Sequence, residues 1–209
     1  MRMMTTPKFR AYCFIKRTLA LGDYAPGETL RIIDFAAKLK LSTTPVREAL
    51  CRLAGETLVE DEGGDGFRVV RLSAAGVADA YRLEALLIGW AIERLIQFTI
   101  ALEAQAKDTT SAPAPMAFIA LRQGAASSVT RGAMAAVADR LAPYRLAERD
   151  VLAQWAEEDR ALQHLFETND WRGLGQLVRR YARRRRQSAA LLIAETELRR
   201  EARSRARKA

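Results

Sequence analysis

The chain has 209 residues, of which 49% are apolar and 28% charged, and its formal net charge at pH 7 is +9. This length and apolar content suit one or two domains with hydrophobic cores and exclude a chain that is disordered throughout. No apolar run approaches the roughly 18 residues of a membrane span, and Met1–Thr6 lacks the apolar segment of a signal peptide, so we expect a cytoplasmic protein with no membrane contact.

Cysteine and histidine are too few to predict a metal or redox centre. Cys13 and Cys51 fall in different predicted helices without a paired spacing, which argues against a disulfide framework. The single histidine, His164, cannot supply the clustered nitrogen ligands of a zinc site. The sequence also contains no nucleophile–base pair and no phosphate-binding glycine loop. We therefore expect no metal, no cofactor, no catalytic residue and no enzymatic function.

The first predicted helix runs from about Pro7 to Leu21. Its apolar side chains, expected to face a core, are Phe9, Cys13, Phe14 and Leu19, and its basic side chains, expected outside, are Lys8, Arg10, Lys16 and Arg17. The basic face has two interpretations, contact with phosphates or exposure to solvent, and both stay open. A turn over residues 22–27 follows, because its proline and glycine interrupt helical structure.

Two short helices with a tight connection come next. The first carries an apolar stripe at Ile33, Ala36, Ala37 and Leu39. The second begins near Pro45, which a first helical turn tolerates, and Thr44 is its expected N-cap. Its apolar face, at helical spacing, comprises Val46, Ala49, Leu50, Leu53 and Ala54. Two short helices joined in this way are typical of a helix-turn-helix.

Two strand-like runs, Leu58–Glu62 and Phe67–Leu72, flank the glycine cluster Gly63–Gly66. Such runs predict a β-hairpin, although the first is acidic and does not alternate cleanly. Three helices followed by a hairpin is the order of a winged helix. We therefore expect a winged-helix domain over residues 1–72.

The rest of the chain is predicted to be helical. A long helix from about Ala75 to Ala104 follows the cap Ser73, and its apolar stripe suits a core or a dimer surface. The stripe consists of Val77, Ala80, Tyr81, Leu83, Leu87, Trp90, Ala91 and Leu95. A polar loop over residues 103–115 precedes four further helices, with breaks near residue 124, residues 130–132, Pro143 and residues 169–170. We expect an all-helical domain over residues 73–198 and a basic tail over 199–209 that frays.

Several segments match a known family in the expected order. They are Tyr24–Leu30, Phe35–Leu39, Ser42–Leu50 and Leu58-Val59 with the glycine hairpin, and, more weakly, Glu157–Leu162, Asn169-Asp170 and Leu177–Tyr181. The first four resemble the N-terminal domain of GntR-family transcription regulators, and the last three resemble a shortened ligand-sensing domain of the FadR-like branch. The resemblance implies a mostly α fold: a winged helix-turn-helix with a small β-hairpin, then an all-α bundle that senses ligands and dimerises.

The resemblance also implies which residues contact double-stranded DNA. They are Ser42, Thr43, Thr44 and Arg47, with Gly64 at the wing tip. A recognition helix enters the major groove, where arginine donates two hydrogen bonds to guanine, so Arg47 is the candidate for base readout. A salt bridge to a nearby glutamate is its alternative role. The family usually has an arginine at Thr43 and a basic residue at Asp65, so we expect fewer phosphate contacts and weak binding unless the protein is dimeric.

The resemblance to the sensing domain is incomplete at its ligand-binding positions. Many domains of that branch hold a metal through one aspartate and three histidines, and the matching positions here are Pro115, Ile119, Asp159 and Tyr181. None is a histidine, and one carboxylate is insufficient for a divalent ion. The arginine that often pairs with a carboxylate effector falls at Glu84, whose charge would repel such a ligand. We therefore predict no metal, and the small-molecule effector, if one exists, stays unidentified.

Basic residues gather near the end of the chain. From Trp171 onward it carries 13 arginines and lysines against three glutamates, most densely at Arg179–Arg186. This run is either a second surface for nucleic acid or an acidic partner, or the solvated face of a helix whose other side is packed. Both interpretations stay open.

Together these features predict a transcription regulator that binds a palindromic operator as a homodimer. The helical domain would set the spacing of the two recognition helices, and an effector would act by favouring one spacing. The alternative is a protein-interaction module that keeps the winged helix as a scaffold, with its acidic wing facing a protein.

Overall fold

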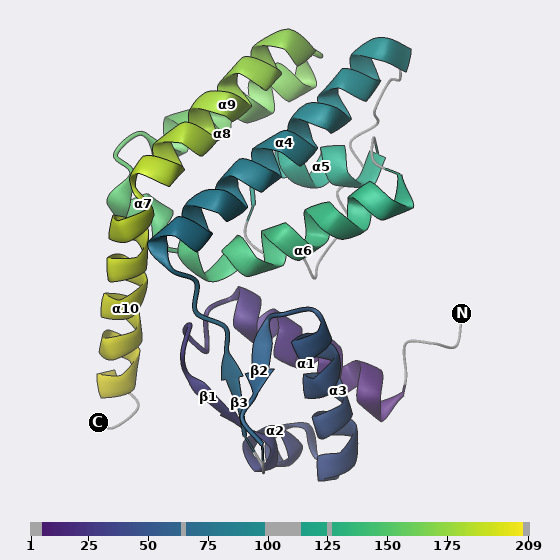
Figure 1. Cartoon of the computed structure of the whole chain (residues 1–209), viewed down its shortest axis with the longest axis vertical. Helices are drawn as coiled ribbons and strands as arrows, with labels where there is room; N and C mark the ends of the chain where they lie inside the picture. Colours follow the sequence, from purple (N-terminus) through teal and green to yellow (C-terminus); the bar gives the residue numbers. More distant parts are fainter. Residues whose placement is uncertain (1–5, 64–65, 99–113, 125–126, 207–209) are drawn as a thin grey trace.

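The computed structural model describes residues 6–63, 66–98, 114–124 and 127–206 (Figure 1). It contains a small winged domain, at the bottom of the view, and a helical domain above it. Gly64, Asp65 and the expected loop up to residue 113 lie outside these ranges. No helix in the described ranges is both long and apolar enough to cross a membrane.

The winged domain consists of α1 (Pro7–Ala20), β1 (Thr29–Arg31), α2 (Ile32–Leu39), α3 (Thr43–Gly55), β2 (Val59–Asp61) and β3 (Gly66–Val69). Its sheet is antiparallel with strand order β1-β3-β2, and Phe67 of β3 lies opposite Leu30 on one side and Asp61 on the other. The helix order and the β2–β3 hairpin confirm the predicted winged helix. β1 escapes sequence prediction because three residues are too few to display an alternating pattern.

One hydrophobic core holds the three helices of this domain against the sheet, with Ile15, Phe35, Leu50 and Phe67 among its fully buried members. The predicted faces of α1 and α2 are wrong at Phe14 and Ile33, which are 37% and 61% exposed. Their neighbours Ile15 and Ile32 are buried instead. Because the residues in each pair are adjacent and apolar, hydrophobic spacing alone does not decide which one points inward.

The helical domain consists of α4 (Ala74–Phe98), α5 (Met116–Gly124), α6 (Ser128–Arg145), α7 (Glu148–Val151), α8 (Trp155–Glu167), α9 (Trp171–Gln187) and α10 (Ala189–Ala206). The long helix α4 lies between α9 and α6, and α10 descends beside the winged domain (Figure 1). Tyr81, Leu95, Leu121 and Leu174 belong to the core that these helices share. The all-helical second domain is confirmed.

The predicted number of helices in this domain and two predicted boundaries are wrong. Six helices, rather than four, lie within the described residues from 114 onward. Pro143 does not end a helix, because α6 continues to Arg145 and the lost backbone hydrogen bond is offset by burial of its neighbours Ala142 and Tyr144. The expected last helix is divided at Ser188, and α10 is helical to Ala206.

Candidate nucleic-acid interface

The recognition helix α3 has one face fixed in the core and one face open. Val46, Ala49, Leu50 and Leu53 are fully buried, so the helix cannot rotate without opening the core of the winged domain. Ser42, Thr43 and Thr44 are exposed at its N-terminal end, and Arg47 follows one turn later with a half-buried side chain. The structure therefore brings four of the five predicted DNA-contacting residues together; the fifth, Gly64, lies outside the described residues.

The N-cap of α3 is Ser42, and the prediction of Thr44 is wrong. The helix includes Thr43 and Thr44 because proline is compatible with the whole first turn, where backbone amides have no partner inside the helix, so Pro45 does not have to be the first residue. The Ser42 side chain makes no capping hydrogen bond. The amides of the first turn have no partners inside the helix, so an anion such as phosphate is favoured at this helix end.

The surroundings of this helix end are only weakly basic. Lys8 pairs with Glu48 at 3.2 Å, and on the wing Arg68 pairs with Glu62 at 2.6 Å. Glu60 and Asp61 on β2 are exposed. The described part of the wing is therefore acidic, as the sequence predicts.

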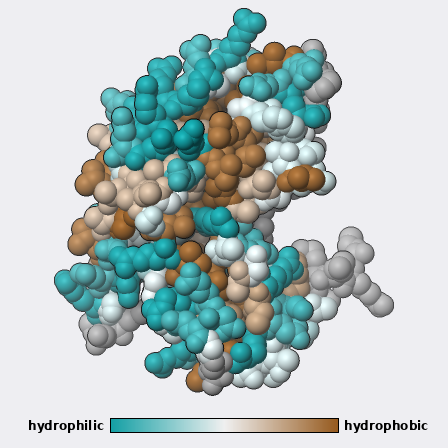
Figure 2. All heavy atoms as spheres, viewed as in Figure 1, coloured by the Kyte–Doolittle hydropathy of each residue, from teal (hydrophilic) through white to brown (hydrophobic). Residues whose placement is uncertain are grey.

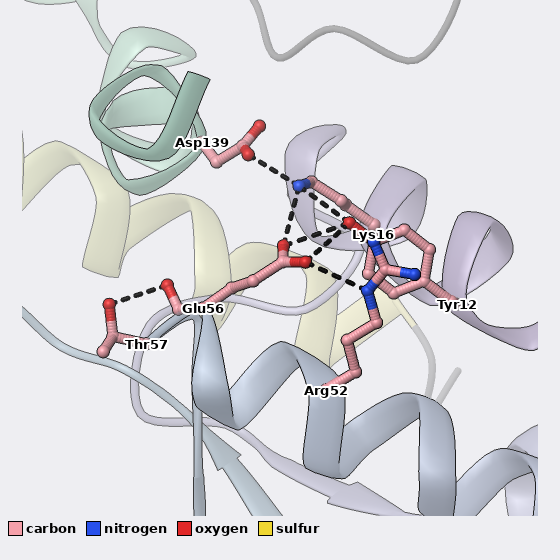
Figure 3. A network of polar contacts seen from close by, with 6 residues as sticks. All are labelled: Tyr12, Lys16, Arg52, Glu56, Thr57 and Asp139. Atoms are coloured by element: carbon pink, nitrogen blue, oxygen red, sulfur yellow. Dashed lines mark hydrogen bonds and ion pairs between the residues drawn. The ribbon is translucent and has the colours of Figure 1, made fainter. Parts of the chain in front are cut away.

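The C-terminal end of α3 is tied to α1 and to the helical domain by the polar network drawn in Figure 3. The Glu56 carboxylate accepts hydrogen bonds from the Tyr12 hydroxyl (2.8 Å), the Lys16 ammonium (2.8 Å) and Arg52 Nε (3.3 Å). The same Lys16 ammonium lies 2.7 Å from the Asp139 carboxylate of α6. The sequence-based expectation that Lys16 faces solvent or phosphate is wrong, because two carboxylates from other helices hold it between the domains.

Burial and ion pairing act in opposite directions within this network. Burial disfavours the charged form of Lys16, but the charges of Asp139 and Glu56 overcome it and raise the pKa of Lys16. Burial also opposes ionisation of Glu56, but its hydrogen bonds from Lys16 and Tyr12 lower the pKa of that carboxyl. For Asp139 burial prevails over the nearby ammonium, so its pKa is raised. Lys16 and Glu56 are therefore charged at neutral pH.

Further contacts join the helical domain to the winged domain. Arg140 of α6 donates to the hydroxyl of Thr57, directly after α3, and Arg71 pairs with Glu197 of α10. The backbone amide of Leu72 donates to the Tyr144 hydroxyl at 2.9 Å. These contacts and the Lys16 network fix the direction of α3 relative to α6.

The helical domain encloses a cavity of about 450 Å³ that opens to solvent. Its charged lining is largely paired within the protein: Arg145 with Glu84, and Arg185 with Glu148 at 2.7 Å and with Glu158. The Arg185 guanidinium also lies 3.3 Å from the centre of the Tyr181 ring. The Tyr181 hydroxyl is buried and has no hydrogen-bond partner among the described residues, so a polar group entering the cavity would find a donor there.

The positions matched to metal ligands partly converge on this cavity. Pro115, Asp159 and Tyr181 line it, whereas Ile119 lines a smaller neighbouring pocket. In the described ranges no three His, Cys, Asp or Glu side chains form a group that could hold a metal ion. Burial and the charge of Glu148 raise the pKa of Asp159. Glu84 does not act as the repelling charge expected from the sequence, because it is buried against Arg145.

The similarity of this chain to known proteins differs between its two domains. Residues 7–69 match the model of the gntR family of bacterial regulatory proteins. The HTH-type transcriptional repressor GlaR of Escherichia coli K12 is 32% identical over 95 residues, which are 44% of this chain and 43% of that protein. The Nta operon transcriptional regulator of Aminobacter aminovorans is 41% identical over 64 residues, 31% of this chain and 30% of that protein. The match thus spans less than half the length of these two relatives.

Two solved structures resemble both domains. Escherichia coli McbR/YncC superimposes with a TM-score of 0.64 at 20% identity, covering 92% of this chain and 99% of that one. A putative GntR transcriptional regulator from Rhodococcus sp. RHA1 superimposes with a TM-score of 0.67 at 15% identity, covering 91% and 99%. These likenesses establish the fold of the whole chain, since their identity is too low to carry more.

Proposed function

We propose that this chain, whose residues 7–69 match the gntR family of bacterial regulatory proteins, is a sequence-specific DNA-binding transcription regulator. The observation that carries the proposal is the exposed N-terminal end of α3, where Ser42, Thr43, Thr44 and Arg47 gather while the opposite face is locked in the core. A helix held in this way presents the same side chains to every ligand. That is what sequence readout requires.

In the proposed complex the N-terminal end of α3 enters the major groove. Arg47 donates two hydrogen bonds to a guanine, and the three hydroxyls contact base edges or phosphates. The first-turn amides hold one phosphate. Gly64 at the wing tip approaches the neighbouring backbone, as the resemblance to the family implies.

The protein acts as a homodimer in this proposal, because a single winged domain with an acidic wing makes few phosphate contacts. The exposed apolar residues Leu83, Leu86 and Trp90 recur on one face of α4 and supply the interface. Figure 2 shows an apolar patch over α4 on this side of the molecule. Two copies related by a two-fold axis would read a palindromic operator with half-sites about one helical turn apart.

Regulation in this proposal passes from the cavity to α3. A small polar effector occupying the cavity contacts Tyr181 and Arg185, on α9, and Arg145, at the end of α6. The same α6 carries Asp139, which holds Lys16 and through it Glu56 at the end of α3. Any shift of α6 therefore changes the separation of the two recognition helices, and the effector favours one separation over another.

The proposal is tested by selecting fragments of a genomic library with wild type and Arg47→Ala side by side at two salt concentrations. Wild type is expected to enrich a short palindromic motif that Arg47→Ala does not enrich. If wild type enriches no motif at low salt, operator binding is refuted. The acidic wing residues Glu60 and Asp61 would then favour the second candidate, a protein-interaction scaffold.

A further inference from the structure

Five exposed arginines form a continuous face on α9. Arg172, Arg179, Arg180, Arg183 and Arg186 fall within an arc of about 120° when successive residues are placed 100° apart around the helix. Their side chains make no ion pair or hydrogen bond with any other residue in the part of the chain that the structure describes. We call this set the arginine face, and its charge is not neutralised within the described protein.

The opposite side of α9 holds this face rigidly. Leu174, Val178 and Tyr181 are buried in the core against α4. Arg185 is 1% exposed and bound to two glutamates, and Arg184 lies 3.7 Å from one of them. Two of the seven arginines of α9 thus pair with glutamates of the helical domain. The other five are exposed to solvent on a helix whose opposite side is packed in the core.

From this arrangement we infer that the arginine face binds the phosphate backbone of double-stranded DNA. The guanidinium group presents a planar fork of donors that matches the oxygens of a phosphate. Arg172 and Arg186 are 14 residues apart, which is about 21 Å along an α-helix. A duplex carries about 12 phosphates on its two strands over that length, which is more than twice the number of arginines on the face.

The composition of the face favours a duplex over other polyanions. Its remaining exposed side chains are Gln176 and Gln187, and it has no aromatic or aliphatic residue. Interfaces with protein partners usually centre on buried aromatic or aliphatic anchors, which this face lacks. A single strand needs aromatic rings on which its bases stack. A phosphate backbone needs neither.

The arginine face and the recognition helix lie at opposite ends of the molecule. In Figure 1 α9 descends from the top of the helical domain to the start of α10, whereas α3 lies in the winged domain at the bottom, and Figure 2 shows the hydrophilic surface over α9. In this inference a duplex in contact with Ser42–Arg47 of the winged domain does not also occupy α9 of the helical domain. The arginine face binds a second segment of DNA, without sequence preference because phosphates carry none, and the protein bridges two duplexes.

The test uses the full chain and DNA without an operator, so it does not depend on sequence-specific recognition. One duplex is fixed to beads, and capture of a second, labelled duplex is measured for three proteins. These are wild type, Arg179→Gln/Arg183→Gln, and the control Arg82→Gln/Arg160→Gln, which removes the same charge from exposed positions of α4 and α8. Duplex affinity is also titrated with salt, and sedimentation reports the oligomeric state of each protein.

Wild type and control are expected to capture the second duplex, and Arg179→Gln/Arg183→Gln to lose most of this capture. The salt slope of the variant should be shallower by about 1.8, which is about 0.9 for each lost phosphate contact. Equal capture by all three proteins would overturn the inference. If wild type captures poly-glutamate as tightly as duplex, the face binds an acidic protein, and if it captures single-stranded DNA as tightly, the face binds a single strand. A change of oligomeric state in the Arg179→Gln/Arg183→Gln variant alone would assign the face to the subunit interface. Each of these results would also overturn the inference.

Discussion

Lys16 joins the two domains through carboxylates on both sides. Its side chain is 20% exposed, and its ammonium lies between Glu56 and Asp139, whose own side chains are 30% and 14% exposed. Lys8 on the same helix also pairs with a glutamate, but that pair is about half exposed on both sides. The two lysines therefore carry the same charge, lie on the same helix and both pair with carboxylates, but only Lys16 is largely buried.

Replacement of Lys16 by Met should lower the free energy of unfolding by roughly 1–3 kcal/mol, because it leaves two partly buried carboxylates without their cation. Lys8→Met should change it by less than about 1 kcal/mol, as expected for an exposed pair. Adding Asp139→Asn to Lys16→Met should recover part of the loss. Urea unfolding measures all three, and equal effects of Lys16→Met and Lys8→Met would contradict the role given to Lys16.

Burial raises the pKa values of the Tyr81, Tyr144 and Tyr181 hydroxyls. In the unfolded chain these groups lose their protons near pH 10. Above that pH the folded state binds more protons than the unfolded state, so the contribution of these tyrosines is complete below about pH 10 and is lost as the pH rises. Stability should therefore fall steeply in alkali.

Tyr181→Phe should leave stability at neutral pH nearly unchanged, because its buried hydroxyl has no hydrogen bond in the described structure to lose. It should make the alkaline decline shallower by up to about 1.4 kcal/mol per pH unit, the value for one proton. Tyr81→Phe should also flatten the decline but weaken the protein at neutral pH, since the Tyr81 hydroxyl donates to Glu148 at 2.6 Å. Urea unfolding at several pH values above about 10 measures this decline. If the free energy of unfolding of Tyr181→Phe fell with pH as steeply as that of wild type, the Tyr181 hydroxyl would not contribute to the alkaline decline.

At the scale of elements, α3 and α9 begin in different ways. Asp170 caps α9 by accepting a hydrogen bond from the Gly173 amide at 2.9 Å, whereas Ser42 at the start of α3 makes no capping bond. Asp170→Ala should therefore destabilise the protein by about 1 kcal/mol, and Ser42→Ala by less than about half of that. Ser42→Ala should instead weaken operator binding. Similar unfolding free energies for the two variants would indicate that Ser42 serves the helix and not DNA.

The sequence predicts helices and strands well where the spacing of apolar residues agrees with the positions of proline and glycine. α1 and the β2–β3 hairpin fall where expected, because Pro7 and the glycine cluster mark boundaries beside clear apolar patterns, whereas α3 begins two residues before Pro45. It fails where two neighbouring apolar residues compete, as at Phe14 and Ile15, and where burial overrides a helix breaker, as at Pro143. Local patterns do not encode the packing that decides these cases.

The candidate site is predictable to a similar degree. The sequence places Arg47 and the three hydroxyl residues before it on one helix end, because they lie close together in the chain, and their contact with DNA stays a prediction. The Lys16 network is missed because Tyr12, Glu56 and Asp139 come from three helices that only the tertiary fold brings together. The pairing of Glu84 with Arg145 is missed for the same reason, as 61 residues separate them.

At the scale of the whole molecule, the proposal requires a dimer that holds two recognition helices at a fixed separation. Leu86 is 62% exposed on the apolar face of α4, and Leu191 on α10 is equally exposed at 61%. Leu86→Glu should convert dimers to monomers and weaken operator binding, because a charge would be buried at the interface. Leu191→Glu should change neither. Sedimentation measures the outcome, and dimers in Leu86→Glu would remove α4 from the interface.

In the proposed function α3 reads DNA sequence through Arg47, so we would measure the affinities of wild type and Arg47→Ala for the selected operator and for a scrambled duplex. Arg47→Ala should lose about 1–3 kcal/mol of operator affinity, roughly 10- to 100-fold, while its affinity for the scrambled duplex changes little. Equal operator affinity in the two proteins, or equal affinity of wild type for both duplexes, would contradict the claim.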